Sequence, residues 1–131
     1  MIKRWSPVAR RRAFIAYALL LFTLTHWPSL RIETDVSRPD LIIHATAFAI
    51  WTVLFASCAF FGAPGSRRNL GMCALIGVVY ACIDEALQGL RFINRHAAVD
   101  DALADILGVA IGILAMAFLA RRTRRRDPSS L

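Results

Sequence analysis

Four long stretches of this chain carry no acidic side chain, lysine or arginine, and they constrain its fold more than any other feature. The stretches are residues 13–30, 41–66, 69–83 and 106–120. A helix rises about 1.5 Å per residue, so about 20 apolar residues cross the roughly 30 Å hydrocarbon core of a bilayer. With flanking residues included, the predicted membrane spans cover about residues 11–28, 41–62, 69–91 and 101–120.

These stretches predict an all-α fold, an integral membrane four-helix bundle with up-down-up-down topology. The bilayer interior offers no hydrogen-bonding partners, so a crossing segment satisfies its backbone groups internally, as a helix does. The composition agrees, because 57% of the residues are hydrophobic and a soluble chain of 131 residues needs a larger polar surface. Residues 1–131 contain no recognisable repeat and are expected to form a single transmembrane domain.

The first apolar stretch has a second interpretation. The Arg11–Arg12 pair before it resembles a twin-arginine export signal, and Lys3–Arg4 resembles the basic start of a signal peptide. No small-x-small cleavage motif follows, because the stretch ends Thr-His-Trp-Pro. An uncleaved membrane anchor is therefore favoured over a cleaved signal.

The basic residues predict the orientation. Twelve of the 16 lysines and arginines fall within residues 3–12, 67–68 and 121–126, which four spans would put on one side of the membrane. The positive-inside rule then places both termini in the cytoplasm, with residues 121–131 as a basic tail against membrane lipids. The net charge of +7 does not indicate nucleic acid, because no aromatic residues interleave with the tail arginines.

Polar residues gather at the opposite side. Eight of the nine acidic residues lie in the first or third loop or in the helix ends beside them. His44 lies about one turn into the second span, and Glu85 and Gln88 share a face near the end of the third. Asp101 and Asp105 share a face at the start of the fourth. An acid that faces lipid costs roughly 3 kcal/mol on insertion scales, so these acids are expected to face inward.

Small residues extend the acidic stripe on the fourth span. Gly108 and Gly112 follow Asp105 on the same face and are predicted helix-packing positions, because small residues allow close backbone approach. Three other polar residues receive structural interpretations. Asp100 is expected to cap the fourth helix, Asp84 to reach the membrane interface, and His26 to belong to the interfacial belt.

The acids also allow a structural ion pair with Arg91 or Arg95, or a divalent metal site. Hard oxygen ligands with one imidazole suit manganese or magnesium better than structural zinc. The candidate ligands would be His44, Glu85, Asp101 and Asp105. The chain has no HExxH, nucleophile elbow, phosphate loop or CxxC motif. No cofactor and no catalytic residue is predicted, and the pattern leans against an enzyme.

Four pieces of the sequence, in order, resemble the VanZ-like family of small membrane proteins. The resemblance runs over about residues 40–112. Asp40-x-x-x-His44 resembles the Asp-Lys-x-x-His that begins a helix in the family, and Glu85-x-x-Gln88 resembles the Glu-x-x-Gln that ends the next. The last pieces resemble the family's block of Arg, Asp, Asn or Asp and two glycines; they are Arg95, Asp101, Asp105, Gly108 and Gly112. Leu41 replaces the usual lysine, and Phe92–Asn94 replaces the usual Pro-Gly.

The resemblance implies a multi-pass protein of the bacterial inner membrane, in a family named for a teicoplanin-resistance protein. The first hypothesis is an accessory or binding protein of the cell envelope, with a link to glycopeptide antibiotic resistance. Its ligand would be a peptidoglycan precursor, a lipid headgroup or a glycopeptide, held by a polar cluster at the outer face. That cluster consists of His44, Glu85, Gln88, Arg95, Asp101 and Asp105. The alternatives are an intramembrane enzyme acting on a lipid-linked substrate, or acids that are purely structural; the oligomeric state stays open.

Overall fold

The computed structural model describes residues 5–27, 39–90 and 99–126, with residues 124–126 described by their backbone alone. Within these residues the chain forms four helices and no strand. The helices are α1 (Pro7–Thr25), α2 (Pro39–Ser57), α3 (Arg67–Gln88) and α4 (Val99–Arg126). The predicted all-α bundle is therefore confirmed.

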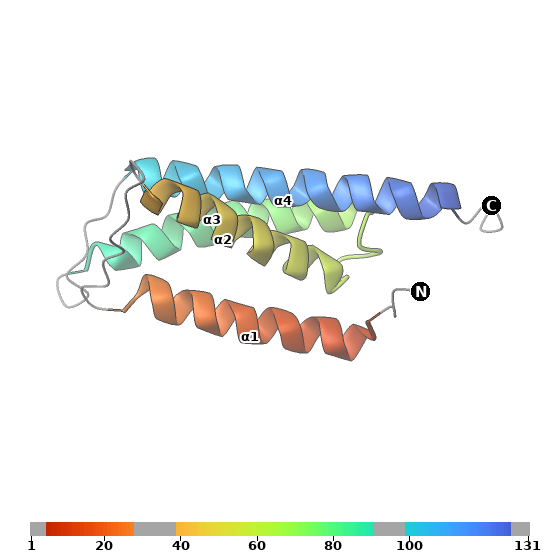
Figure 1. Cartoon of the computed structure of the whole chain (residues 1–131), viewed down its shortest axis with the longest axis horizontal. Helices are drawn as coiled ribbons and strands as arrows, with labels where there is room; N and C mark the ends of the chain where they lie inside the picture. Colours follow the sequence, from red (N-terminus) through yellow and green to blue (C-terminus); the bar gives the residue numbers. More distant parts are fainter. Residues whose placement is uncertain (1–4, 28–38, 91–98, 127–131) are drawn as a thin grey trace.

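Consecutive helices run in opposite directions, as the up-down-up-down topology requires (Figure 1). The start of α1 and the end of α4 lie at the same end of the bundle, which we call the terminal end. At the other end, α1 and α3 finish while α2 and α4 begin, and we call this the loop end. The two ends differ in their charged residues, so the topology separates basic from acidic side chains.

The contact between α2 and α4 is the most extensive in the bundle, whereas α1 packs mainly on α2. Two glycines make this contact possible. A Cβ atom at Gly108 would collide with the carbonyl oxygen of Ala45, and one at Gly112 would lie 2.8 Å from the carbonyl oxygen of Ala49. The two glycine positions on α4 thus let its backbone approach α2 more closely than any side chain would permit.

Aromatic side chains fill the middle of the bundle. Trp51 of α2 stacks with Tyr80 of α3 at a centroid distance of 5.3 Å and meets the edge of Phe14 from α1 at 5.4 Å. Phe48, which is fully buried, stacks on the same tyrosine at 5.5 Å. Such pairs stabilise beyond the apolar area that they bury, and here they tie three helices together between the two ends.

The second helix ends earlier than the predicted boundary near residue 62. It stops at Ser57, and the side chain of Asn69 from the start of α3 contacts the backbone there. The Asn69 amide donates to the carbonyl oxygens of Ala56 at 2.9 Å and Pro64 at 3.2 Å. A helix leaves its last carbonyls without helical partners, so a contact from another helix fixes this boundary, which hydrophobicity alone places too late.

Two other boundaries also differ from the prediction. The first helix begins at Pro7 because Ser6 caps it, its hydroxyl accepting a hydrogen bond from the backbone N–H of Ala9 at 3.1 Å. The fourth helix continues to Arg126, so the first part of the predicted basic tail is helical. The rest of that tail, residues 127–131, lies outside the described residues.

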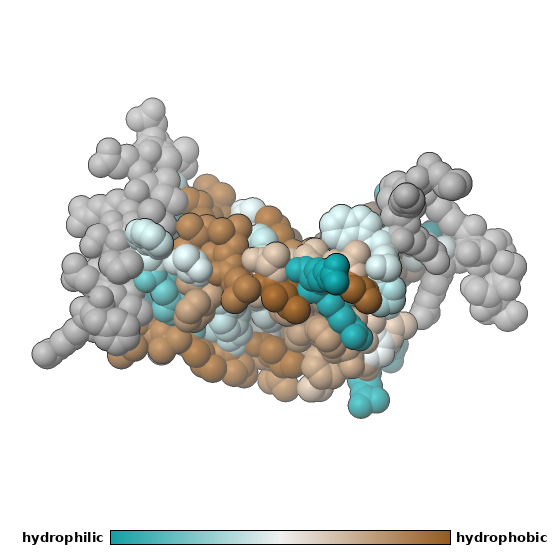
Figure 2. Space-filling view, turned by 90° about the horizontal axis from the view of Figure 1, so that it is seen from below, coloured by the Kyte–Doolittle hydropathy of each residue, from teal (hydrophilic) through white to brown (hydrophobic). Residues whose placement is uncertain are grey.

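Large apolar side chains cover the outside of the bundle. Val99 is 79% exposed and Leu114 is 69% exposed, and Figure 2 shows a mainly hydrophobic surface on one face. Helices α2, α3 and the Val99–Thr123 part of α4 are long and apolar enough to cross a membrane. Water would disfavour so continuous an apolar surface. The chain is therefore a membrane protein, while a crossing by α1 stays a prediction because Arg10–Arg12 place three charges within that helix.

Candidate functional site

A buried histidine–aspartate pair joins α2 to α4 near the loop end. His44 Nδ1 lies 2.9 Å from Asp105 Oδ1. The close approach of Gly108 to Ala45, the residue after His44, brings the two side chains within reach. An ionised carboxylate only accepts hydrogen bonds, so it favours the ring tautomer that donates from Nδ1. In a neutral ring, Nε2 is then the nitrogen that can accept a proton.

One oxygen of this pair lacks a hydrogen-bond partner in the described part of the chain. Asp105 has no exposed surface, and its Oδ2 makes no hydrogen bond within the described residues. A buried acceptor without a donor costs roughly 1–3 kcal/mol, more for a charged group. The site therefore contains an acceptor that a donor from outside the described residues would stabilise.

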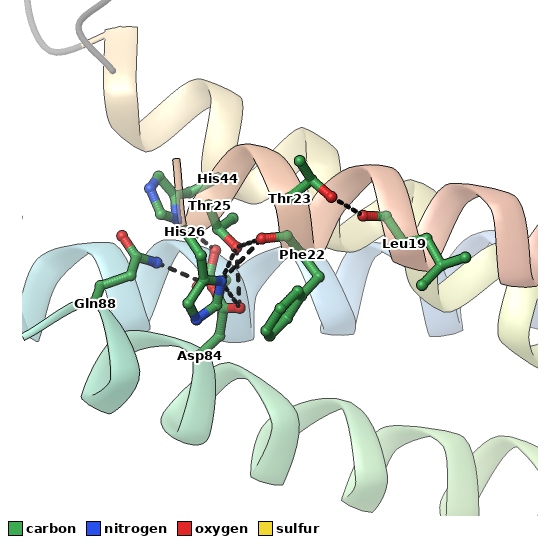
Figure 3. Close-up of polar contacts among 9 residues, drawn as sticks. Leu19, Phe22, Thr23, Thr25, His26, His44, Asp84 and Gln88 are labelled. Carbon is green, nitrogen blue, oxygen red and sulfur yellow. Dashed lines mark hydrogen bonds and ion pairs between the residues drawn. The ribbon is translucent and has the colours of Figure 1, made fainter. Parts of the chain in front are cut away.

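A second buried carboxylate, Asp84, joins α3 to α1 (Figure 3). Its Oδ2 accepts a hydrogen bond from Gln88 Nε2 at 3.0 Å, and its Oδ1 accepts one from the Thr25 hydroxyl at 3.1 Å. The Tyr80 hydroxyl also interacts with it. Asp84 has no exposed surface, so these donors replace water around the carboxylate.

His26 supports this second group from the end of α1. Its Nδ1 lies 2.9 Å from the carbonyl oxygen of Phe22 and 2.9 Å from the Thr25 hydroxyl oxygen, and its ring stacks on Phe22. A carbonyl oxygen only accepts, so the geometry assigns the proton to Nδ1. The Thr25 hydroxyl can then accept from His26 and donate its own proton to Asp84, which makes the three side chains one directed chain of hydrogen bonds.

The two groups are close enough to act on one another electrostatically. Asp105 experiences the charges of Asp84 and Asp101, and His44 experiences those of Glu85 and Asp101. Glu85 is buried and Asp101 is partly buried. We call this set the acidic cluster; its members are His44, Asp84, Glu85, Asp101 and Asp105.

Charge is distributed unequally along the bundle. Within residues 5–27, 39–90 and 99–126, every arginine belongs to the terminal end, and these residues include no lysine. The acidic cluster therefore has no cationic side chain beside it in the described part of the chain. Buried charges without counter-charges are unfavourable unless hydrogen bonds satisfy them, as Thr25 and Gln88 do for Asp84.

Most of the predicted site residues lie in or beside this cluster. His44, Glu85 and Asp105 are buried, and Asp101 lies near them at the start of α4. Gln88 is buried as well, but the hydrogen bond of its amide goes to Asp84. Arg95 lies outside the described residues, and so does Arg91, its alternative in the predicted structural ion pair.

Sequence reasoning missed Asp84, Thr25 and His26. Asp84 was expected at the interface, but the structure buries it completely. His26 makes hydrogen bonds within this group, while its place in an interfacial belt stays a prediction. A signal existed in the third helix. The buried small residues Cys73, Gly77 and Ala81 recur at four-residue intervals, and Asp84 continues this stripe three residues later.

The predicted metal ligands do not form a recognisable metal site. Among the described residues, no group of three or more His, Cys, Asp or Glu side chains is arranged to hold an ion. The arrangement suits other chemistry: its carboxylates can accept hydrogen bonds from an amine or hydroxyl, and its imidazole can take up a proton. Comparisons of the chain with family models, with curated proteins and with solved structures each returned no match.

Proposed function

We propose that the chain is a four-pass protein of the bacterial plasma membrane, with both termini in the cytoplasm. Helix α1 packs lengthwise on α2, so it accompanies its neighbours through the bilayer if they cross it (Figure 1). Long arginine side chains can reach the headgroup region from within a helix end, which accommodates Arg10–Arg12. The arginines of the terminal end support a cytoplasmic location for it.

The acidic cluster then faces the outer side, where it binds a ligand of the cell envelope. The observation that carries this proposal is Asp105, whose side chain is completely buried while one of its oxygens has no donor in the described residues. A ligand with an amine or hydroxyl group would supply that donor. Peptidoglycan precursors and glycopeptide antibiotics both carry such groups. The resemblance to the VanZ-like family supports this class of ligand, and with it a role in glycopeptide resistance.

A second candidate function is catalysis on a lipid-linked substrate. It is favoured by the His44–Asp105 pair, in which a carboxylate orients an imidazole as in many general bases. His44 would remove a proton from a substrate hydroxyl or from water, and Asp105 would stabilise the resulting imidazolium. This route needs no nucleophilic side chain, because the attacking oxygen belongs to the substrate or to water.

The test compares bacterial cells that carry wild-type protein, Asp105→Asn, Asp40→Asn or no protein. Asp40 is an exposed acid at the same end, so its variant controls for the loss of one charge. Susceptibility is measured against teicoplanin-like glycopeptides and other envelope stresses, with membrane abundance measured by blot. The purified proteins are then tested for a ligand-induced shift in thermal unfolding with a glycopeptide and with a peptidoglycan-precursor headgroup.

We expect wild type and Asp40→Asn to protect cells and to bind, and Asp105→Asn to lose both at equal abundance. If Asp105→Asn instead loses abundance and thermal stability together with protection, the acids are structural and the binding proposal fails. If all four strains respond alike, the cell-envelope role fails. Turnover of a precursor by wild type that Asp105→Asn abolishes would favour the catalytic candidate.

A further inference from the structure

A cavity of about 490 Å³ lies at the terminal end, far from the acidic cluster. It is enclosed by the start of α1, the turn after α2 and the last turns of α4. Its lining residues are Trp5, Arg10, Ala63, Pro64, Gly65, Met116, Leu119, Ala120 and Thr123. Trp5 and Leu119 are more than half exposed, so the cavity opens to the surroundings of the bundle. Its volume is in the range of small-ligand sites.

Arg10 is the one charged residue that lines this cavity, and one nitrogen of its guanidinium lacks a hydrogen-bond partner in the described part of the chain. The Nε atom is buried and has no hydrogen-bond partner among the described residues. The neighbouring arginines differ from it, because Arg11 lies 5.1 Å from the Phe60 ring centroid and Arg122 lies 4.3 Å from that of Phe118. Of these three arginines, Arg10 is therefore the one with a buried N–H group that an oxygen acceptor would stabilise.

The described acids cannot supply that acceptor. Within residues 5–27, 39–90 and 99–126, every Asp and Glu lies toward the loop end. Apart from Thr123, the other side chains that line the cavity are apolar, with Met116 and Leu119 along one wall. A site with one partly buried cation beside an apolar wall matches a ligand that has an anionic head and a hydrocarbon chain.

The position of the cavity matches the depth of lipid headgroups. It lies where the apolar stretches of α1 and α4 give way to arginines, and in Figure 2 hydrophilic side chains stand out toward this end of the α1 face. Basic side chains near a membrane surface attract anionic lipids by about 1 kcal/mol each. Arg12 and Arg121, both exposed, add this attraction around the cavity without lining it.

We infer that the cavity is a binding site for one anionic phospholipid. The phosphate accepts a hydrogen bond from Arg10 Nε, and the first part of an acyl chain lies along Met116 and Leu119. The site requires only that the bundle resides in a membrane, so it is independent of the ligand proposed for the acidic cluster. It would anchor the start of α1 to the end of α4, two helices whose described Cα atoms nowhere come within 8 Å of one another.

The test uses the full chain purified in detergent, with phosphatidylglycerol or phosphatidylcholine titrated into the micelles. The apparent affinity is taken from the rise in thermal unfolding temperature. Three variants are compared with wild type. Arg10→Gln removes the cation that lines the cavity, and Arg12→Gln is the matched control because it removes an exposed charge two residues away. Thr123→Trp fills the cavity from an exposed position without a change of charge.

We expect wild type to bind phosphatidylglycerol more tightly than phosphatidylcholine, and Arg10→Gln to weaken that binding by roughly tenfold, as for the loss of one charged hydrogen bond. Arg12→Gln should stay within about twofold of wild type, and Thr123→Trp should weaken both lipids. Equal losses in Arg10→Gln and Arg12→Gln would mean diffuse surface attraction and would overturn the inference. Unchanged binding by Thr123→Trp, or equal affinity for the two lipids in wild type, would also overturn it.

Discussion

Two buried polar side chains at opposite ends of the bundle differ in how completely the protein satisfies their hydrogen bonds. At the terminal end, Asn69 has no exposed surface, and its amide pairs with three backbone groups, those of Ala56, Phe61 and Pro64. At the loop end, Asp105 is equally buried, yet one of its oxygens has no partner in the described residues. The first group is neutral and fully paired with backbone, whereas the second is acidic and keeps acceptor capacity.

The difference separates a structural polar group from a candidate functional one. A neutral amide that satisfies backbone atoms stabilises a turn and offers nothing to a ligand. A cluster of buried acids lowers stability unless something compensates it, and such groups inside membranes usually have a function. The comparison predicts that changes at the Asn69 end mainly alter stability, and that changes of charge at the acidic cluster mainly alter binding.

The largest effect on stability is expected from Asn69→Asp. The substitution keeps the shape but turns a donor toward the carbonyl oxygens of Ala56 and Pro64 into an acceptor, and it buries a charge. We expect a loss of about 3 kcal/mol in the free energy of unfolding, measured by reversible unfolding in mixed detergent micelles. Ser66→Ala, which removes the cap of the same helix, is the milder control at about 1 kcal/mol. If Asn69→Asp lost no more stability than the control, the hydrogen bonds of Asn69 would not be important for the stability of the fold.

The next largest effect is expected from Gly108→Ala. Its methyl group would collide with the Ala45 carbonyl oxygen, so α2 and α4 must separate next to the His44–Asp105 pair. We expect a loss of about 2 kcal/mol in unfolding free energy, together with weaker ligand binding. Gly71→Ala is the matched control, because nothing lies within 4 Å of its added Cβ and the change suits a helix. Equal stability of the two variants would show that the close helix approach is dispensable.

A smaller effect is expected from Asp84→Asn. The new amide keeps an oxygen to accept from Thr25, and its NH₂ group can donate to Gln88 once that amide turns over. The free energy of unfolding should change by less than about 1 kcal/mol, in contrast to Asn69→Asp at the other end. The measurement is the same unfolding equilibrium. A loss as large as that of Asn69→Asp would contradict the comparison and make the charge of Asp84 structural.

The smallest effect concerns the labelling rate of the Cys58 thiol, which shows whether this side chain at the terminal end stays buried. Burial raises the pKa of Cys58, and the opposing influence of Arg11 and Arg10 only reduces this rise. Since the thiolate is the reactive form, maleimide labelling near neutral pH should be slower in the folded protein than in the detergent-unfolded protein. Labelling in the folded state should increase as the pH rises past the ordinary thiol range. Mass spectrometry with Cys58→Ser as control assigns the site, and equally fast labelling of both forms would indicate an open end.

Much of the fold followed from hydrophobicity, and the errors lie where a tertiary contact decides. The four uncharged stretches predicted four helices and their antiparallel order, because a long apolar segment has few alternatives in a membrane. The end of α2 was misplaced because a side chain from another helix, Asn69, pairs with one of its last carbonyls, that of Ala56. Sequence windows contain no information about a partner 13 residues away.

The candidate site was predicted in part for a similar reason. His44, Glu85 and Asp105 were identified because acids and imidazoles within apolar helices must face inward. Asp84 was missed because its angular distance from Glu85 suggested another face, whereas α1 and α4 flank α3 on both sides of that region. The neighbouring helices decide how much of the circumference of a helix is buried, and the sequence of that helix alone does not show where they pack.

The sequence by itself determined that this is an all-α membrane protein, because the length of the apolar segments decides which of them can enter a membrane. The grouping of arginines and acids along the sequence also determined that one end of the bundle is basic and the other acidic. Only the tertiary structure decided which polar atoms meet. The pairing of His44 with Asp105 depends on a glycine contact between α2 and α4, and the pairing of Asp84 with Thr25 depends on where α1 packs. Hydrophobic burial acts on every apolar residue alike, whereas a hydrogen bond requires two particular atoms within about 3 Å, and only the assembled bundle provides that.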